Sequence, residues 1–514
     1  MRKVLCLLLQ ITGADMANTN SPQFSTYKTE YIAFNKTANY RDGNLSDKRD
    51  SYILNMYYDY ESNKDKNSPV RLKKRPGLVD TTYALTRSVS TDPIRGSYYN
   101  ANANTFYWAV SNKVFSVSPD LGASIRTVAT LVTSEGYVGF TDFLKSDNTR
   151  YVIFTDGTDL WVDNYVSGTC STVVDADLPS PHVPYPVYLD GYIFLADAGS
   201  GDIYNSNNDD PTAWTAGDFI NAEMSADYIE VLIRIKNYIL VMGYDSIEYF
   251  YDAGIATGSP LQRNDSPFQS FGTLGGVCTL GNLVIFVGHQ KNQNLGVYVI
   301  NDFKINKISS DIVDRSILPA GTTINEKSTL TLNVNAHSMS LDGHHFYVLN
   351  CENATWVYDL AHNEWYEWAD TTNAPLNIEA VWNMRNGHCY TAIGSTDKIK
   401  FFSPAAYTDN GVNFNCIYRT EKLDFGTKNW KYINRLFLDV NQQEDSGTSN
   451  IEITWSDKDW SDTGVGARNI NLFSISPFIN RLGRTRSRSF QIKYQDAYPL
   501  FLKGMYLDIN VGQH

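Results

Sequence analysis

The chain of 514 residues contains no apolar stretch that approaches the ~20 residues a helix needs to cross a bilayer. It also contains no long segment with a sustained helical apolar period, which argues against a helical fold. P-loop, dinucleotide-binding and G-x-S-x-G nucleophile motifs are all absent. The sequence therefore predicts no membrane helix, no cofactor and no enzyme of these classes.

Basic charge is also in short supply. The chain has 43 Lys and Arg against 56 Asp and Glu, a formal net charge of -13. A protein that binds free nucleic acid through a basic groove usually shows the opposite balance, so that role is excluded as the global function. An acidic total keeps a protein soluble and repels DNA.

Metal-binding patterns are missing as well. No two of the six cysteines have metal-finger spacing, and we expect free, buried thiols in a reducing compartment. His289, His344, His345, His362 and His388 show no paired ligand spacing with cysteine or carboxylate. The sequence thus predicts no metal site.

What the chain does have is aromatic residues and repeats. Aromatics make up 13% of the chain, with 34 tyrosines, which favours half-buried β-strands. Seven times, an apolar run of three to five residues is followed by a polar turn and a second apolar run. The paired runs occupy 106–110 and 114–117, 151–154 and 160–162, 192–195 and 202–204, 238–241 and 247–250, 283–287 and 297–300, 346–349 and 356–358, and 389–393 and 399–402. The copies start 45, 41, 46, 45, 63 and 43 residues apart, which is the spacing of four-stranded propeller blades.

These repeats divide the chain into three parts. We expect an all-β protein with an N-terminal arm over 1–75, a β-propeller over 76–405 and an antiparallel β-sandwich over 406–514. Seven blades are predicted, with six as the alternative if the first or last hairpin joins the C-terminal sheet. The long 63-residue step contains apolar residues between 305 and 317 that predict a short helix or an extra strand.

Two short segments point toward a different class of protein. Residues 1–9 have the charged start and short apolar run of a secretion signal, although no clean cleavage site follows, and an upstream start codon or an N-terminal strand would also explain them. Residues 456–460, Ser-Asp-Lys-Asp-Trp, resemble a shortened Asp-box turn of sialidase propellers. Because they lie outside the repeats, a structural hairpin tip is the favoured interpretation.

The densest basic segment spans 481–488 and contains Arg481, Arg484, Arg486 and Arg488. Alternation in an extended strand places the last three on one side. The segment is interpreted as a charged edge that prevents aggregation, as a contact with an acidic partner subunit or with phosphates, or as a hydrolytic arginine cluster. We also count Lys73, Lys74 and Arg75, which close the arm, among the candidate subunit-interface residues.

The order of these segments resembles a known family. The stretch 480–494, Asn-Arg-Leu-Gly-Arg-Thr-Arg-Ser-Arg-Ser-Phe-Gln-Ile-Lys-Tyr, and the final strand ending at 507–509 resemble the C-terminus of the tail hub proteins of short-tailed bacteriophages, also called nozzle or packaged-DNA stabilisation proteins. Arg-Pro-Gly-Leu at 75–78 and the hairpin 237–250 with the Gly/Ala-rich 252–258 are similar to further parts of that family. The resemblance covers roughly 75–510.

The resemblance implies a structural virion protein without catalytic, cofactor or metal residues. The resemblance implies a ring of six copies below the portal and adaptor of the tail, assembled in the host cytoplasm. Tail needle, spike or fibre proteins would be further partners, and double-stranded DNA would pass the lumen without sequence-specific binding and be held until ejection. The alternatives from the residues themselves are a secreted or surface propeller that binds or hydrolyses glycans, and a propeller scaffold for protein partners.

Overall fold

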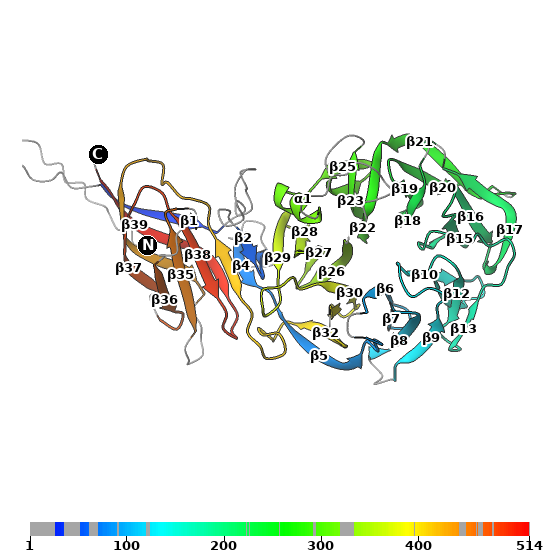
Figure 1. Ribbon diagram of the computed structural model, residues 1–514, viewed down its shortest axis with the longest axis horizontal. Coiled ribbons are helices and arrows are strands. Elements are labelled where there is room, and N and C mark those ends of the chain that lie inside the picture. Colours follow the sequence, from blue (N-terminus) through cyan, green and yellow to red (C-terminus); the bar gives the residue numbers. More distant parts are fainter. Residues whose placement is uncertain are drawn as a thin grey trace, which may run out of the picture.

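The computed structural model consists of β-sheets, antiparallel except for one parallel pairing, with one short α-helix, α1 (Asp311–Ile317), in the part of the chain that it describes (Figure 1). The described residues are 26–34, 52–60, 70–89, 92–119, 124–222, 224–225, 227–255, 257–290, 295–318, 334–394, 396–441, 449–458, 460, 466–474 and 477–512. None of the helices in these ranges is both long and apolar enough to cross a bilayer.

Seven four-stranded units surround one axis and form a β-propeller (Figure 1). The first three blades are blade 1, with β6 (Ile94–Asn100), β7 (Thr105–Val110), β8 (Lys113–Val117) and β9 (Arg126–Thr130); blade 2, with β10 (Gly139–Leu144), β11 (Arg150–Thr155), β12 (Leu160–Asn164) and β13 (Thr169–Thr172); and blade 3, with β14 (Val187–Leu189), β15 (Tyr192–Ala196), β16 (Asp202–Asn207) and β17 (Asp210–Asn221).

Three more blades follow along the chain. They are blade 4, with β18 (Ile229–Ile235), β19 (Tyr238–Gly243), β20 (Ile247–Asp252) and β21 (Leu261–Gln269); blade 5, with β22 (Phe271–Leu280), β23 (Leu283–Gln290), β24 (Gly296–Asn301) and β25 (Lys304–Lys307); and blade 6, with β26 (Asn335–Leu341), β27 (His344–Cys351), β28 (Ala354–Asp359) and β29 (Glu364–Trp368).

Blade 7 is built from both ends of the repeat region. Its inner strands are β30 (Ile378–Asn383), β31 (Cys389–Ile393) and β32 (Lys398–Ser403). Its outermost strand is β5 (Gly77–Ala84), which pairs antiparallel with β32 and closes the ring. The prediction of a seven-bladed propeller is confirmed, and each predicted hairpin forms the second and third strands of one blade.

The burial of each blade explains why the hairpins are so apolar. Every blade lies between two others, so its middle strands are covered on both faces; β28 is buried over its whole length. Outer strands such as β13 and β25 are mostly exposed. The described residues contain seven apolar clusters, one between each pair of neighbouring blades, and the cluster between blades 6 and 7 continues into the sandwich.

A β-sandwich lies beside blades 6 and 7 (Figure 1). One sheet has the order β3-β4-β39-β34-β37, with β1 also paired to β39; the other has the order β2-β33-β38-β35-β36. The strands are β1 (Thr26–Ala33), β2 (Tyr52–Leu54), β3 (Met56–Tyr60), β4 (Val70–Lys74), β33 (Cys416–Arg419), β34 (Lys431–Val440), β35 (Asn450–Ser456), β36 (Ala467–Asn471), β37 (Phe478–Thr485), β38 (Ser489–Tyr494) and β39 (Phe501–Val511).

The segment expected to be an N-terminal arm contributes its described strands to this sandwich. β1 pairs with the last strand over eight positions, from Thr26 opposite Val511 to Ala33 opposite Gly504. β2 pairs with β33 on one side and, at Leu54, with β29 of blade 6 on the other. The second sandwich sheet is therefore continuous with a propeller blade, which joins the two bodies through backbone hydrogen bonds.

Candidate functional sites: the propeller axis and the arginine segment

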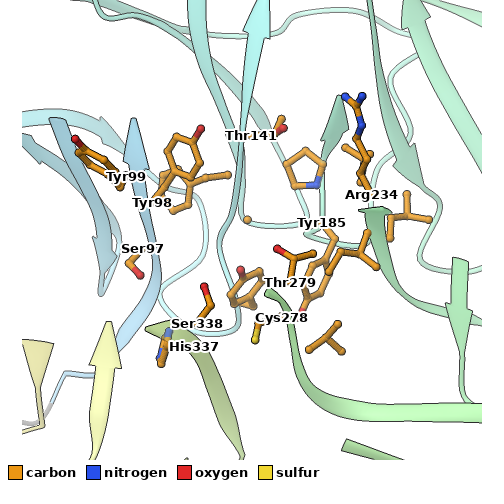
Figure 2. Close-up of a pocket in the computed structure, with 18 of the residues that line it drawn as sticks. Ser97, Tyr98, Tyr99, Thr141, Tyr185, Arg234, Cys278, Thr279, His337 and Ser338 are labelled. Carbon is orange, nitrogen blue, oxygen red and sulfur yellow. The ribbon is translucent and has the colours of Figure 1, made fainter. Parts of the chain in front are cut away.

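The propeller axis encloses a cavity of about 620 Å³, lined by residues of all seven inner strands. Figure 2 shows Ser97, Cys278, His337 and Ser338 around the same space. A second cavity of about 780 Å³ lies next to it and shares Tyr137 and Tyr185, whose rings stack 4.7 Å apart. These are the dimensions of small-molecule pockets, far too small for a DNA duplex.

Apart from Asp142 and Arg234, the residues that line the 620 Å³ cavity are uncharged at pH 7. Burial lowers the pKa of His337 to about 4, so this imidazole is neutral at pH 7. Burial raises the pKa of Cys278 to about 12, so its thiol stays protonated. A nucleophilic Cys–His pair needs the opposite, a thiolate beside a basic imidazole, so these two residues do not form one.

A histidine–aspartate cluster lies at the junction of propeller and sandwich. The Nδ1 atoms of His344 and His362 lie 2.9 and 2.8 Å from the same Asp359 Oδ2 atom, and all three side chains are buried. Nε2 of His344 also lies 3.7 Å from Asp59 Oδ1, on strand β3 of the sandwich. The sequence shows no paired ligand spacing for these histidines, yet the fold brings His344 and His362 together around Asp359.

The pKa values of His344 and Asp359 distinguish a buried ion pair from a metal site. Burial alone would lower the pKa of His344, but hydrogen bonds and charges from Asp359 and Asp59 outweigh it and raise that pKa to about 9. Burial alone would raise the pKa of Asp359, but hydrogen bonds from both histidines outweigh it and lower that pKa to about 2. Although the three groups lie close enough to hold a metal ion, a protonated His344 has no lone pair for one. The cluster fits a buried ion pair.

The arginine segment does not form one surface. Arg481, Arg484 and Arg486 are exposed, whereas Arg488 is buried. The predicted alternation fails because β37 ends at Thr485 and the chain crosses to the other sheet, which it enters with β38 at Ser489. Arg488 is thereby turned into the sandwich.

The buried Arg488 is held entirely by its own chain. Its Nε and Nη2 atoms donate to the two carboxylate oxygens of Asp457 at 2.7 and 2.8 Å, and Nη1 donates to the Leu482 carbonyl at 2.6 Å. The subunit-interface prediction is therefore wrong for Arg488. Asp457 belongs to the Asp-box-like turn, in which Ser456 Oγ accepts hydrogen bonds from the backbone amides of Lys458 and Trp460. This turn is a structural hairpin tip.

Lys74 and Arg75 lie in the interior, whereas Lys73 is partly exposed. Arg75 is 0% exposed and donates to both carboxylate oxygens of Asp409, at 3.0 and 2.7 Å. Lys74 is 1% exposed and donates to the Asp496 carbonyl at 2.8 Å, and burial lowers its pKa. Both are therefore unavailable to a partner subunit, contrary to the prediction. Lys73 forms an ion pair with Asp342 at 2.9 Å.

Sequence reasoning missed a row of aromatic side chains on the outer face of the sheet that contains β37. Cross-strand register places Tyr31 opposite Tyr506, Tyr506 opposite Phe437, and Phe437 opposite Phe478. Ring centres lie 4.5 Å apart in the tyrosine pair and 5.3 Å apart in the phenylalanine pair. The row is formed by residues from four strands that are distant in sequence, so no local sequence pattern predicts it.

Arginines accompany the aromatic row. The guanidinium of Arg435 lies 5.3 Å from the ring centres of both Phe437 and Phe478. Those of Arg484 and Arg486 lie 4.9 and 5.0 Å from the ring centre of Trp430, which is 40% exposed. Exposed Tyr, Trp, Phe and Arg are the residue types enriched where proteins bind one another.

Comparison of the chain with models of known protein families gives a match. The model of the Phage_stabilise family, described as the β-propeller of bacteriophage P22 Gp10, matches residues 41–396. No curated protein matches the chain.

Similar chains occur among solved structures of other proteins. The N-terminal domain of Nup159 is 10% identical, covers 68% of this chain and 98% of its own, and has a TM-score of 0.36. YCF48 bound to D1 peptide is 8% identical, with coverage of 64% and 99% and a TM-score of 0.37. A chain of the mitotic checkpoint complex is 10% identical, with coverage of 67% and 96% and a TM-score of 0.39.

Proposed function

This chain belongs to the family of the bacteriophage P22 Gp10 β-propeller, phage structural proteins that stabilise packaged DNA, and from that premise we propose that it is the tail hub of a short-tailed phage. In this role several copies, most simply six, form a ring below the portal and adaptor proteins. The ring continues the DNA channel and retains the packaged DNA until ejection.

The family match carries the proposal, because it spans the propeller from before the closing strand β5 to beyond β31 of blade 7. The remaining propeller strand, β32, and most strands of the sandwich lie after it. The part of this chain that matches the family is thus the propeller. The proposed position in the tail rests on that match.

The cavities favour a DNA path between subunits. The propeller axis holds cavities of about 620 and 780 Å³, which is too little space for a duplex, so we place the DNA path outside the single propeller. A lumen between copies would be walled by a protein of net charge -13. Acidic walls repel phosphates and so let DNA slide without being bound.

We further propose that the protein acts without catalysis. The Cys278 thiol is protonated and the His337 imidazole is neutral, and the buried cluster of His344 and Asp359 is closed to substrate by its own contacts. Partners would be the portal and adaptor above and needle, spike or fibre proteins below. Arg481, Arg484 and Arg486 remain candidates for these contacts because they are exposed.

The proposal is tested in the phage. Virions assembled without this protein should contain empty heads, and supplying the protein in trans should restore nuclease-resistant packaged DNA. Heads that keep their DNA in its absence would contradict a role in retention. Hydrolysis of surface glycans by the purified protein, lost on mutation of one residue, would support the glycan-binding alternative instead.

A further inference from the structure

Charge is strongly segregated along this chain. Residues 76–405 contain 36 acidic and 17 basic residues, whereas the rest of the chain contains 20 acidic and 26 basic residues. The extreme lies between Arg150 and Arg234, where 14 acidic residues occur without one lysine or arginine. The net charge of -13 therefore conceals an acidic propeller and a slightly basic remainder.

The acidic stretch has a defined place in the molecule. Residues 151–233 build most of blade 2, all of blade 3 and the start of blade 4, at the end of the molecule opposite the sandwich (Figure 1). We call the surface of this stretch the acidic end. Asp177 is exposed and Asp218 partly exposed there.

The acidic end also exposes apolar side chains. Val174 is 93% exposed, Val166 78% and Phe219 43%. Met224 and Tyr228 of the same stretch are also exposed, at 42% and 54%. Apolar side chains surrounded by charge are typical of surfaces that bind other proteins.

The opposite end of the molecule is the outer face of the sandwich sheet, which we call the aromatic–arginine face. Its members are the aromatic row and the aromatic residues and arginines beside it: Tyr31, Phe437, Phe478 and Tyr506, with Trp430, Tyr432, Arg435, Arg484 and Arg486. Five of the aromatic side chains are between 40% and 48% exposed. This face and the acidic end are complementary in charge, and both are partly apolar.

We propose that the aromatic–arginine face of one copy docks on the acidic end of the next copy. This inference rests on the homo-oligomeric ring of the proposed function and specifies which surfaces hold it together. Arginine side chains pair with carboxylates in geometry-specific, often bidentate contacts, and aromatic side chains supply apolar area around them.

Charge also selects how the copies are arranged. In a two-fold symmetric contact made by the aromatic–arginine face alone, that face meets a second copy of itself, which brings two sets of arginines together without carboxylate partners. A contact between two different surfaces avoids this repulsion. Such head-to-tail contacts repeat from copy to copy and close into a ring when the rotation per copy allows.

The test uses two double variants of the full chain that reverse charge at one end each. R484E/R486E removes the basic partner, and D177K/D218K removes the acidic partner. In low salt, sedimentation should show self-association of the parent, weakened at least about 10-fold in each variant. K304E/K398E, which reverses two exposed lysines in blades 5 and 7, has the same charge as R484E/R486E and should associate like the parent.

Mixing the two variants separates this arrangement from others. One variant keeps only the acidic end and the other only the aromatic–arginine face, so together they can form a single contact and no more. An equimolar mixture should therefore give 1:1 dimers that do not grow, while each variant alone stays monomeric. High salt should dissolve the dimers.

The proposal is overturned if either variant associates like the parent, if the mixture forms no dimer, or if the parent is monomeric at low salt. Melting temperatures within a few degrees of the parent would show that the variants are folded. None of these outcomes decides whether the protein retains DNA, because retention is measured in virions that lack or contain the whole chain. Failure of the docking contact and failure of the proposed function are thus read out separately.

Discussion

Arg75 illustrates how a charged residue can be structural in this protein. It follows β4, the last sandwich strand before the propeller in the sequence, and precedes β5, which closes the propeller. Besides Asp409, its guanidinium donates to Asn55 Oδ1 at 3.0 Å and to the Ala369 carbonyl at 3.1 Å. These partners come from both bodies, so Arg75 ties propeller and sandwich together at one point.

Arg75→Lys should therefore destabilise the protein although it keeps the charge. Lysine cannot reproduce the bidentate contact with Asp409 together with the contacts to Asn55 and Ala369, so several of these buried hydrogen bonds are lost. The free energy of unfolding, measured by urea denaturation, should fall by about 2–4 kcal/mol. The same exchange at the exposed Arg481 should change it by less than about 0.5 kcal/mol, and an equal loss at both positions would contradict this account.

His344 makes stability depend on pH. Its pKa is about 9 in the folded protein and about 6.5 in an unfolded chain, so its stabilising effect is complete below about pH 6.5 and is lost as pH rises through 9. For Asp359, with a folded pKa of about 2, the effect is complete above about pH 4 and is lost as pH falls through 2. The two effects overlap between about pH 4 and 6.5.

We expect the free energy of unfolding to drop between pH 6.5 and 9 by an amount on the order of 3 kcal/mol. His344→Gln should abolish most of this slope, because glutamine does not titrate. His388→Gln, at an exposed histidine, should leave the slope unchanged. A slope that survives in the His344 variant would assign the pH dependence to other groups.

At the scale of elements, the closing strand β5 has no room for a side chain at its first residue. Gly77 begins this strand, and a Cβ atom there would lie 2.1 Å from the Thr408 carbonyl oxygen. That oxygen belongs to the backbone, so it cannot move aside without shifting the segment that leads from blade 7 to the sandwich. The glycine is needed for close approach.

Gly77→Ala should thus lower the free energy of unfolding by about 1–3 kcal/mol or more. Gly217→Ala is the matched control, since Gly217 lies in β17 and a Cβ atom there would contact nothing within 4 Å. Chemical denaturation of both variants gives the comparison. Equal stability of the two would show that β5 adapts to the added methyl group.

The strands also show which parts of the fold can be predicted from the sequence. The hairpins are evident because their strands are adjacent in sequence and buried on both faces, which gives short apolar runs at a regular period. Strand β37 gives no such pattern, because Arg481 and Gly483 adopt positive φ angles of 58° and 85° and break its alternation. The pairing of β1 with β39 joins segments at opposite ends of the chain, and no local signal encodes it.

The candidate site residues also divide into those that the local sequence predicts and those that depend on how distant strands meet. The exposure of Arg484 and Arg486 follows from local charge, whereas the burial of Arg488 depends on the step between two sheets. The histidine cluster had a usable signal: Asp359 pairs with Phe346 across the hairpin, and His344 lies two residues from Phe346 on the same face. Assigning the strand register of each hairpin would have placed His344 beside Asp359.

At the scale of the whole molecule, propeller and sandwich are expected to unfold as one unit. A nine-stranded sheet runs from β26 of blade 6 through β2 to β36 of the sandwich, and one apolar cluster includes both Trp368 of the propeller and Leu507 of the sandwich. Domains joined only by a linker unfold in separate steps, whereas a shared sheet and core couple them. Differential scanning calorimetry should show one transition whose calorimetric and van't Hoff enthalpies agree.

Arg75→Ala removes the buried hydrogen bonds that join propeller and sandwich, and it should split the single unfolding transition into two. Two transitions in the parent chain would show that the sandwich folds independently of the propeller despite the shared sheet.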